Sequence, residues 1–446
     1  MDRERQRPVS GRSGVVVIGS GFGGFFAARR LRRLRVDVTV LAATDSFLYT
    51  PLLPDVAVGT VDPRSVLIPL ASTLRGVTIV RGQADRVDLN SQTVHYTDAR
   101  GQQAELGYRR LLLAPGSVTK LLPIPGLSDH AIGLKTATEA LYLREKVLAQ
   151  LEAATTITDA ARRREALTFV VVGAGHAGVE LTAQMARLAH NLVPLYPGVT
   201  RDDVRWLLVD VADEVMPELG GSLGRSALRL LRRRGVDVRL GVSVERVRDH
   251  EVALTDGTRV RCGTLVWCAG VVGNPLIEAL GLPTSKGRLV VDKVLRVPQH
   301  HDVYAIGDAA AVPDLTKPQD EHGQRPLCPP TAQHAMRQAT AVARNIVADL
   351  DGRPLRPYRH HDLGLVVDLG GPDAAATPVG FRLRGRLAKA VTLGYHLYAL
   401  PTGKRRIRVA VDWAIAGKRP DDVSLRSLPQ SAALIVNAED GGPAIS

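Results

Sequence analysis

Two glycine-rich turns of the same design constrain this chain more than any other feature; they lie 154 residues apart, counted from Gly19 to Gly173. Each turn follows a short, unbroken apolar run (15–18 and 167–172) and precedes a stretch with helical periodicity, after which a second apolar run begins. Strand, glycine turn, helix and strand form a βαβ unit, in which backbone and helix N-terminus can bind a pyrophosphate. The pattern therefore predicts an α/β fold with two Rossmann-like dinucleotide-binding domains. The glycines of the two turns are Gly19, Gly21, Gly24, Gly173, Gly175 and Gly178.

The residue at the end of each unit's second strand helps to identify the ligand, because a carboxylate there usually binds the ribose. In the second unit this residue is Asp210. Its charge should repel a 2′-phosphate, so NADH is expected in preference to NADPH; a surface carboxylate without a ligand is the alternative. In the first unit the place is taken by Ala42, and the nearby Asp45 is more typical of a turn.

A third motif completes the first unit. An apolar run at 303–306 leads into Gly307-Asp308, nearly 290 residues after the first glycine turn. Alone, this motif is typical of any strand end. Paired with an N-terminal glycine turn it is a fingerprint of FAD binding, in which Asp308 would form a hydrogen bond with the ribityl chain.

Composition narrows the class of protein further. The 446 residues suit two or three domains, and the formal net charge of +13 suits anionic ligands, an anionic membrane surface, or simply arginine spread over solvated faces. No stretch is apolar enough to span a bilayer, and the polar, basic N-terminus does not resemble a signal peptide. Basic residues are not interleaved with aromatic ones, so nucleic acid is not an expected partner.

The cysteines and histidines favour no further chemistry. Three cysteines are too few for a disulfide scaffold and suit a reducing compartment. Inert, buried thiols are the favoured interpretation of Cys262, Cys268 and Cys328, although a redox pair of Cys268 and Cys328 stays open. The pair His360-His361 has no companion ligands, so no metal site is expected.

Beyond these motifs, the chain resembles the type II (alternative, non-proton-pumping) NADH:quinone oxidoreductases, which belong to the two-dinucleotide-binding-domain flavoproteins. The resemblance extends from about residue 15 to 346. Five stretches carry it: 47–59 beside the flavin, 112–117 at the crossover between domains, 178–181 on the NAD helix, 265–271 under the nicotinamide, and 329–335 where flavin meets quinone.

The resemblance implies the following sites. FAD would be bound by Gly19, Gly21, Gly24, Pro51, Ala114, Gly116, Gly307, Asp308 and Ala332. NAD(H) would be bound by Gly173, Gly175, Gly178, Glu180, Asp210 and Gly270. The electron-acceptor side would contain Ala332, Gln333, Gln184 and Arg337. Because the flavin performs the redox chemistry, no catalytic nucleophile is expected.

Two departures from the family pattern fall on the acceptor side. Gln184 stands where the family usually has a second glutamate linked to proton delivery, and Arg337 stands where it usually has glutamine. A third departure, Ala42 in place of the ribose-binding acid, is also found in some alternative NADH dehydrogenases. The sequence therefore predicts an intact NADH half and an altered quinone half.

The domain boundaries follow from these motifs. The FAD domain is expected to be discontinuous, at 12–125 and 295–350, with the NAD(H) domain at 126–294. A separate, basic amphipathic segment at 355–446 would follow. In the family this end lies on the membrane and reaches quinone, which predicts a peripheral protein on the cytoplasmic, inner face of the cell membrane. An ordinary packing or homodimer helix is the alternative.

The sequence as a whole predicts an FAD-dependent NADH dehydrogenase that passes hydride from NADH to FAD and electrons to a membrane quinone, without pumping protons. Two alternatives stay open. One is a soluble FAD/NADH oxidoreductase with a different acceptor. The other is a flavin-binding redox sensor with little turnover.

Overall fold

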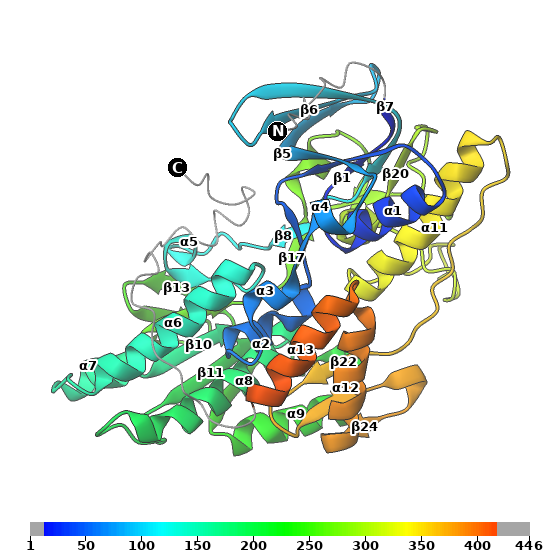
Figure 1. Ribbon diagram of the computed structural model, residues 1–446. Helices are drawn as coiled ribbons and strands as arrows, with labels where there is room; N and C mark the ends of the chain where they lie inside the picture. The colour runs from blue at the N-terminus through cyan, green and yellow to red at the C-terminus, as the bar shows by residue number, and fades with distance from the viewer. Residues whose placement is uncertain (1–12, 417–446) are drawn as a thin grey trace.

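Two sheets with parallel cores dominate the computed structural model, which describes residues 13–416 (Figure 1). The first sheet has six strands and lies at the top of Figure 1. Four of its pairings are parallel, and the central strand β1 is a buried Val-rich run, as expected of a strand covered on both faces. Its strands are β1 (Ser13–Ile18), β2 (Val38–Ala42), β5 (Thr78–Asp88), β6 (Thr93–Asp98), β7 (Gln103–Leu113) and β20 (Val303–Ala305).

The second sheet lies at the lower left of Figure 1 and is parallel throughout, in the order β12-β11-β10-β16-β9. Its central strand β10 is buried along its whole length. The two sheets confirm the predicted α/β fold with two Rossmann-like units. The strands are β9 (Ala131–Ile132), β10 (Thr168–Val172), β11 (Arg205–Asp210), β12 (Val236–Leu240) and β16 (Thr264–Trp267), and an antiparallel meander of β13 (Val244–Arg248), β14 (Glu251–Leu254) and β15 (Arg259–Arg261) adjoins them.

Short strands join the two units where the chain passes between them. Strand β8 (Ser117–Thr119) on the way out pairs with β17 (Val271–Gly273) on the way back. Further along, β19 (Arg288–Val290) pairs with both β18 (Thr284–Ser285) and β21 (Ala310–Ala311). The chain therefore crosses between the units twice, side by side.

Helices cover the sheets and fill the space between them. Helix α1 packs against α11, and α2 packs against both α6 and α8. Helix α1 begins at Phe22, so Gly23 and Gly24 of the glycine turn belong to its first turn. The main helices are α1 (Phe22–Arg33), α2 (Leu53–Ala57), α3 (Pro63–Val66), α6 (Ala137–Ala154), α7 (Ala160–Ala166), α8 (His176–Leu192), α9 (Gly221–Arg233) and α11 (Ala332–Leu350).

The C-terminal segment packs onto the rest of the molecule, although the sequence suggests a separate element. Its sheet of β22 (Val366–Asp368), β23 (Ala374–Ala376) and β24 (Leu383–Arg384) leads into α12 (Gly385–Ala399) and α13 (Gly403–Ala416). Val367, Leu369 and Val409 are buried in the main hydrophobic core. Strand β22 contacts α8, and α13 contacts α3. Residues 417–446 of the expected segment lie outside the described residues.

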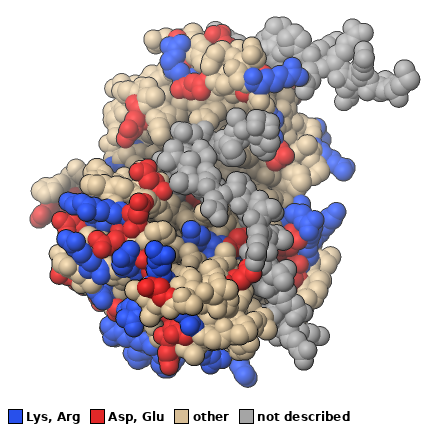
Figure 2. Space-filling view, turned by 90° about the vertical axis from the view of Figure 1, so that its left-hand side faces the viewer, with Lys and Arg blue, Asp and Glu red and all other residues tan. Residues whose placement is uncertain are grey.

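Charges of both signs are mixed on the face shown in Figure 2. Basic side chains gather in its lower half, and acidic ones lie among them. No helix within residues 13–416 is long and apolar enough to cross a membrane.

Candidate active site

The first glycine turn is shaped by close backbone contacts. Gly19 has φ +99°, and a Cβ added there would lie 2.2 Å from the Ala114 carbonyl oxygen. A Cβ on Gly24 would lie 1.9 Å from the Gly19 carbonyl oxygen. By contrast, a Cβ on Gly21, which caps α1, would meet nothing within 4 Å. The turn is thus packed on its inner side and open at the helix N-terminus, as a pyrophosphate site requires.

The second glycine turn repeats this geometry on the other sheet. Gly173 has φ +110°, and an added Cβ would lie 2.4 Å from the Cys268 carbonyl oxygen. A Cβ on Gly178 would lie 1.8 Å from the Gly173 carbonyl oxygen, while the space beside Gly175, the cap of α8, is open. The two turns predicted from the sequence therefore share one geometry, packed on the inner side and open at a helix N-terminus.

The two βαβ units differ at the residue that ends the second strand of each. Asp210 ends β11, and its carboxylate accepts hydrogen bonds from the backbone N–H groups of Ala174, within the glycine turn, and Ala212. The Asp210 carboxylate therefore stabilises the turn and lies beside it, where a ribose would lie. Ala42 ends β2 and offers no such group. Asp45 lies in a turn, with 81% of its side chain exposed, and its carbonyl accepts from Leu70.

Asp308 belongs to a chain of three polar side chains between the two units. It accepts a hydrogen bond from the Ser117 hydroxyl at 2.7 Å, and Ser117 accepts one from the Lys135 ammonium group at 2.7 Å. Burial lowers the pKa of Lys135, while the carboxylates of Asp308 and Glu139 oppose this shift. The neighbouring Gly307 N–H donates to the Gln338 side chain. The sequence motifs identified Asp308 but missed Lys135 and Gln338, which belong to no recognisable pattern.

The other residues expected at the cofactors lie at bends of the backbone. Gly116 and Gly270 have φ of +80° and +98° at the crossings between the units. The carbonyl of Gly116 accepts from Asn274, and that of Gly270 accepts from Lys120. Pro51 lies in the short 3₁₀ turn before α2, and Ala332 is the first residue of α11.

The two glutamines expected on the acceptor side both bind the C-terminal segment. Gln333 donates to the Gly364 carbonyl at 3.1 Å and accepts from the Leu363 N–H at 3.0 Å. Gln184 is buried, and its amide lies 3.5 Å from the Asp368 carbonyl. The C-terminal segment is therefore joined to both α8 and α11. Arg337 lies on the same helix as Gln333, and its charge opposes the burial that raises the pKa of Tyr395.

A cluster of buried ionisable groups lies next to Gln184. Asp368 forms an ion pair with Lys389, and its backbone N–H donates to Glu180 at 2.7 Å. Asp55 on α2 accepts a hydrogen bond from the Trp413 indole at 3.0 Å. His396 on α12 forms a hydrogen bond with Tyr49 at 3.1 Å. Residues from the flavin-side segment, α8 and the C-terminal helices thus meet here, and of the three carboxylates only Glu180 was expected from the sequence.

Burial shifts the protonation of this cluster. It raises the pKa of Asp55 to about 6, with a further contribution from the Asp368 carboxylate. It also raises the pKa of Glu180 well above the ordinary range of a carboxyl group. Burial lowers the pKa of His396 to about 4. The cluster therefore contains two carboxyl groups that can hold a proton at higher pH than an exposed one.

The described cysteines and histidines show no sign of other chemistry. All three thiols are free, and burial raises the pKa of each to about 12, so they stay protonated. His360 stacks on His334 with ring centroids 3.6 Å apart and bonds to Tyr358. Within residues 13–416, no group of His, Cys, Asp and Glu is arranged to hold a metal ion.

Comparison with known proteins agrees with this geometry. Residues 13–339 match the pyridine nucleotide-disulphide oxidoreductase family. Two type II NADH:quinone oxidoreductases of Mycobacterium tuberculosis are similar to the chain. NdhA is 32% identical over 426 residues, 92% of this chain and 88% of that protein. Ndh is 32% identical over 417 residues, 90% of this chain and 87% of that protein. The resemblance drawn from the motifs is confirmed.

Solved structures share the fold at lower identity. NDH2 from Plasmodium falciparum, solved in complex with NADH, has a TM-score of 0.85 and 20% identity, covering 92% of this chain and 99% of that one. The sulfide:quinone oxidoreductase of Aquifex aeolicus has a TM-score of 0.70 and 21% identity, covering 89% and 92%. The fold is therefore one that these proteins share over most of the chain.

Proposed function

The chain belongs to the pyridine nucleotide-disulphide oxidoreductase family and, within it, to the type II NADH:quinone oxidoreductases, and from this premise we propose that it is an FAD-dependent NADH dehydrogenase. NADH is the hydride donor and a membrane quinone is the electron acceptor, with no pumping of protons. One observation supports this proposal above all others. Two glycine turns, each packed inside and open at a helix N-terminus, lie on the two sheets of a single chain.

The residues around the first turn fit FAD. The open side of Gly21 and the N-terminus of α1 suit the pyrophosphate, and Asp308 suits the ribityl chain. Ser117 and Lys135 hold the Asp308 carboxylate in place. Pro51, Ala114, Gly116 and Ala332 would border the flavin.

The residues around the second turn fit NADH. The open side of Gly175 suits its pyrophosphate, and Asp210 suits the ribose diol. Glu180 and Gly270 would lie toward the nicotinamide. A phosphate on the ribose would place two negative charges together, so NADH is preferred over NADPH.

Bound FAD supplies the redox chemistry, accepting hydride from NADH and passing electrons to the quinone. The chain's own residues bind and orient the two dinucleotides and supply protons to the acceptor side. Asp55 and Glu180 suit the supply of protons, because burial lets their carboxyl groups hold a proton at higher pH than an exposed carboxyl group does. Gln184 cannot hold one, but it lies beside carboxyl groups that can.

The C-terminal helices suit the surface of an anionic membrane on the cytoplasmic side. Leu387, Tyr398, Ile407 and Ile415 expose more than half of their surface. Of the eight basic residues between 382 and 408, four bind within the molecule: Lys389 to Asp368, Arg405 to the Arg64 carbonyl, Arg406 to the Leu400 carbonyl and Arg408 to Asp62. Arg382, Arg384, Arg386 and Lys404 then remain for lipid, at roughly 1 kcal/mol each.

This membrane contact predicts salt-sensitive binding. The full-length protein should sediment with vesicles that contain anionic phospholipid at low salt and be released in good part by high salt without detergent. Replacing Arg382, Arg384 and Arg386 by glutamine should weaken the binding, whereas replacing the distant Arg75, Arg100 and Arg109 should not. Equal binding by both triple variants would mean that the segment serves packing or a homodimer.

Steady-state oxidation of NADH with a short-chain quinone tests the proposed activity. Sustained oxidation of NADH by the quinone is the result expected of an NADH:quinone oxidoreductase. A protein whose flavin is reduced by NADH but passes electrons only to other acceptors would instead be a soluble oxidoreductase. Slow or absent reduction of the flavin by NADH would identify a redox sensor.

A further inference from the structure

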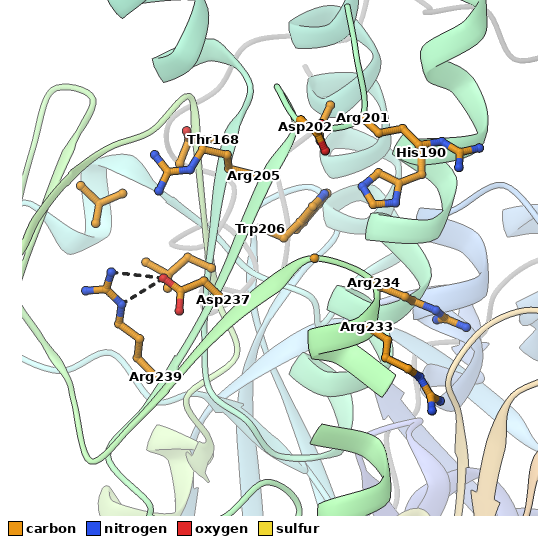
Figure 3. Close-up of a pocket in the computed structure, with 14 residues that line it drawn as sticks. Thr168, His190, Arg201, Asp202, Arg205, Trp206, Arg233, Arg234, Asp237 and Arg239 are labelled. Atoms are coloured by element: carbon orange, nitrogen blue, oxygen red, sulfur yellow. Dashed lines mark hydrogen bonds and ion pairs between the residues drawn. The ribbon is translucent and has the colours of Figure 1, made fainter. Parts of the chain in front are cut away.

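Arg234 joins the second βαβ unit to the C-terminal segment, although no sequence motif contains it. It directly follows the last residue of α9, and only 14% of its side chain is exposed. Its guanidinium donates to the Ala183 carbonyl on α8 at 2.9 Å. Figure 3 shows this side chain extending away from Trp206 and Asp237 of the same unit.

The same guanidinium also binds the turn between β22 and β23, at residues 369–373. It donates to the carbonyls of Leu369 and Gly370, the latter at 3.1 Å, and pairs with the Asp373 carboxylate at 2.9 Å. A guanidinium is a rigid, planar fork of donors, so these contacts fix direction as well as distance. One side chain therefore holds both α8 and the turn.

The turn at 369–373 is shaped to lie against α8. Gly370 and Gly371 have φ of +80° and +64°, conformations that favour glycine. A Cβ on Gly370 would lie 3.3 Å from the Gln184 Cγ, and a Cβ on Gly371 would overlap the Arg187 guanidinium. The turn therefore packs directly on the helix that carries Gln184.

Asp368 directly precedes this turn and belongs to the buried acceptor-side cluster. Its backbone N–H donates to Glu180 at 2.7 Å, while its carboxylate accepts from the Gly370 N–H at 2.8 Å and pairs with Lys389. Burial raises the pKa of Glu180 and of Asp55, and the Asp368 carboxylate adds to both shifts. The position of the turn therefore determines where Asp368 lies relative to Glu180.

We propose that Arg234 is a positioning residue for the acceptor half of the reaction, because it holds the turn at 369–373 against α8 and so keeps the proton-supplying carboxyl groups in place. This inference rests on the proposed function. Within the described residues, the side-chain hydrogen bonds of Arg234 go to Ala183 and to the turn, and not to the glycine turn at 173–178. Reduction of the flavin by NADH should therefore not depend on Arg234.

Stopped-flow measurements on the FAD-loaded, full-length Arg234→Lys variant test this role. Lysine keeps the charge but lacks the planar fork. Reduction of the flavin by NADH should stay within about twofold of the parent's rate. Reoxidation by a short-chain quinone should slow by about tenfold to a hundredfold, the loss that a displacement of about 1 Å can cause. Reoxidation by ferricyanide, which takes electrons without protons, should be unchanged.

The pH profile separates this role from a mere loss of stability. If the turn loosens, water reaches the cluster, and the pKa of Glu180 and Asp55 falls toward the ordinary range. The decline of quinone reoxidation with rising pH should then occur at lower pH in Arg234→Lys, by about half a unit or more. Deuterium exchange provides a readout besides activity: it should be faster at residues 366–376 and unchanged at 173–178.

Arg239→Lys is the matched control. Arg239 lies in the same unit with 28% of its side chain exposed, and it also pairs with carboxylates, Asp237 at 3.1 Å (Figure 3) and Asp256 at 3.6 Å. Its replacement should leave both half-reactions unchanged. Asp373→Asn removes one partner of Arg234, should slow quinone reoxidation by about threefold, and replaces Arg234→Lys if that variant does not fold.

Two kinds of failure can be told apart. The role of Arg234 is wrong if quinone reoxidises its variant at the parent's rate, if reoxidation slows without a change in the pH profile, or if Arg239→Lys slows it equally. If quinone does not reoxidise the unmodified protein, the proposed function fails, and the role of Arg234 fails with it.

Discussion

Two regions of this molecule depend on different kinds of contact: the donor region, around the two glycine turns, and the acceptor region, around Gln184. Around the two glycine turns, the decisive contacts are between backbone atoms, and a single added Cβ would overlap a carbonyl oxygen at about 2 Å. Around Gln184, the decisive contacts involve carboxylates and their partners, from α2, α8, β22, α12 and α13. The first region is fixed by steric limits, and the second by the balance between burial and ion pairing.

This difference determines how each region should respond to change. Backbone contacts of this kind are insensitive to pH and salt, but they tolerate no larger side chain. The buried cluster tolerates neutral replacements of similar shape, because an uncharged group loses less on burial than a charge does. Its stability, however, depends on pH. The predictions below use this contrast, in order of decreasing effect.

The largest effect is expected from Gly173→Ala. The new Cβ would lie 2.4 Å from the Cys268 carbonyl oxygen, in a backbone conformation that alanine avoids. The protein should keep FAD but lose NADH affinity by more than about a hundredfold, about 3 kcal/mol. Gly19→Ala should give the reciprocal result, a protein that does not retain FAD. Stopped-flow reduction by NADH and flavin absorbance measure the two outcomes.

Gly101→Ala is the control for backbone strain alone. Gly101 has φ +77°, but an added Cβ meets nothing within 4 Å. It should keep both FAD and NADH binding. If all three variants behave alike, positive φ rather than the close carbonyl contacts explains the loss, and the steric account of the donor region fails.

The same contrast explains what the sequence could predict. A glycine turn is a local pattern, so Gly19 and Gly173 identify both βαβ units, and Asp308 follows from its place after an apolar run. Asp55, Asp368 and His396 come together only through tertiary packing, and no spacing along the chain relates them. For the same reason the sequence separates the C-terminal segment from the core, although Val367 and Val409 are buried in it.

Asp55→Asn should change how stability depends on pH. The pKa of Asp55 is about 6 in the folded protein, compared with 3.8 for an exposed aspartate. The folded state therefore binds this proton more tightly than the unfolded state. The resulting contribution to stability is complete below about pH 4 and is lost as the pH rises through about 6. The loss amounts to about 3 kcal/mol, which Asp55→Asn should abolish.

The measurement is the free energy of unfolding in urea at pH 5 and pH 8, with excess FAD. The difference between the two values should shrink in Asp55→Asn. Asp45→Asn is the control, because its side chain is 81% exposed. An unchanged difference in Asp55→Asn would show that Asp55 is ionised in the folded protein at both pH values.

Asp210→Asn should reduce the preference for NADH over NADPH. The Asp210 carboxylate accepts N–H groups from Ala174 and Ala212 and would face a 2′-phosphate with like charge. Removing the charge should shift the ratio of kcat/KM values by about tenfold to a hundredfold, about 1–3 kcal/mol. The asparagine amide cannot accept both N–H groups, so NADH binding itself should weaken slightly. A variant with the parent's ratio would exclude Asp210 as the source of the preference.

The smallest effect is expected from Gln184→Glu. By the family pattern, this change restores a glutamate on the acceptor side and should speed reoxidation of the flavin by quinone. The structure limits the gain, because Gln184 already lies near the carboxyl groups of Glu180 and Asp368. A further glutamate in this buried cluster should stay protonated and alter the reoxidation rate by no more than about threefold, about 0.6 kcal/mol of activation free energy. Stopped-flow reoxidation from pH 6 to 8 provides the measurement, and Gln184→Met separates loss of the amide from gain of the acid. A gain of tenfold or more would mean that position 184 limits proton delivery and that Asp55 and Glu180 do not supply it.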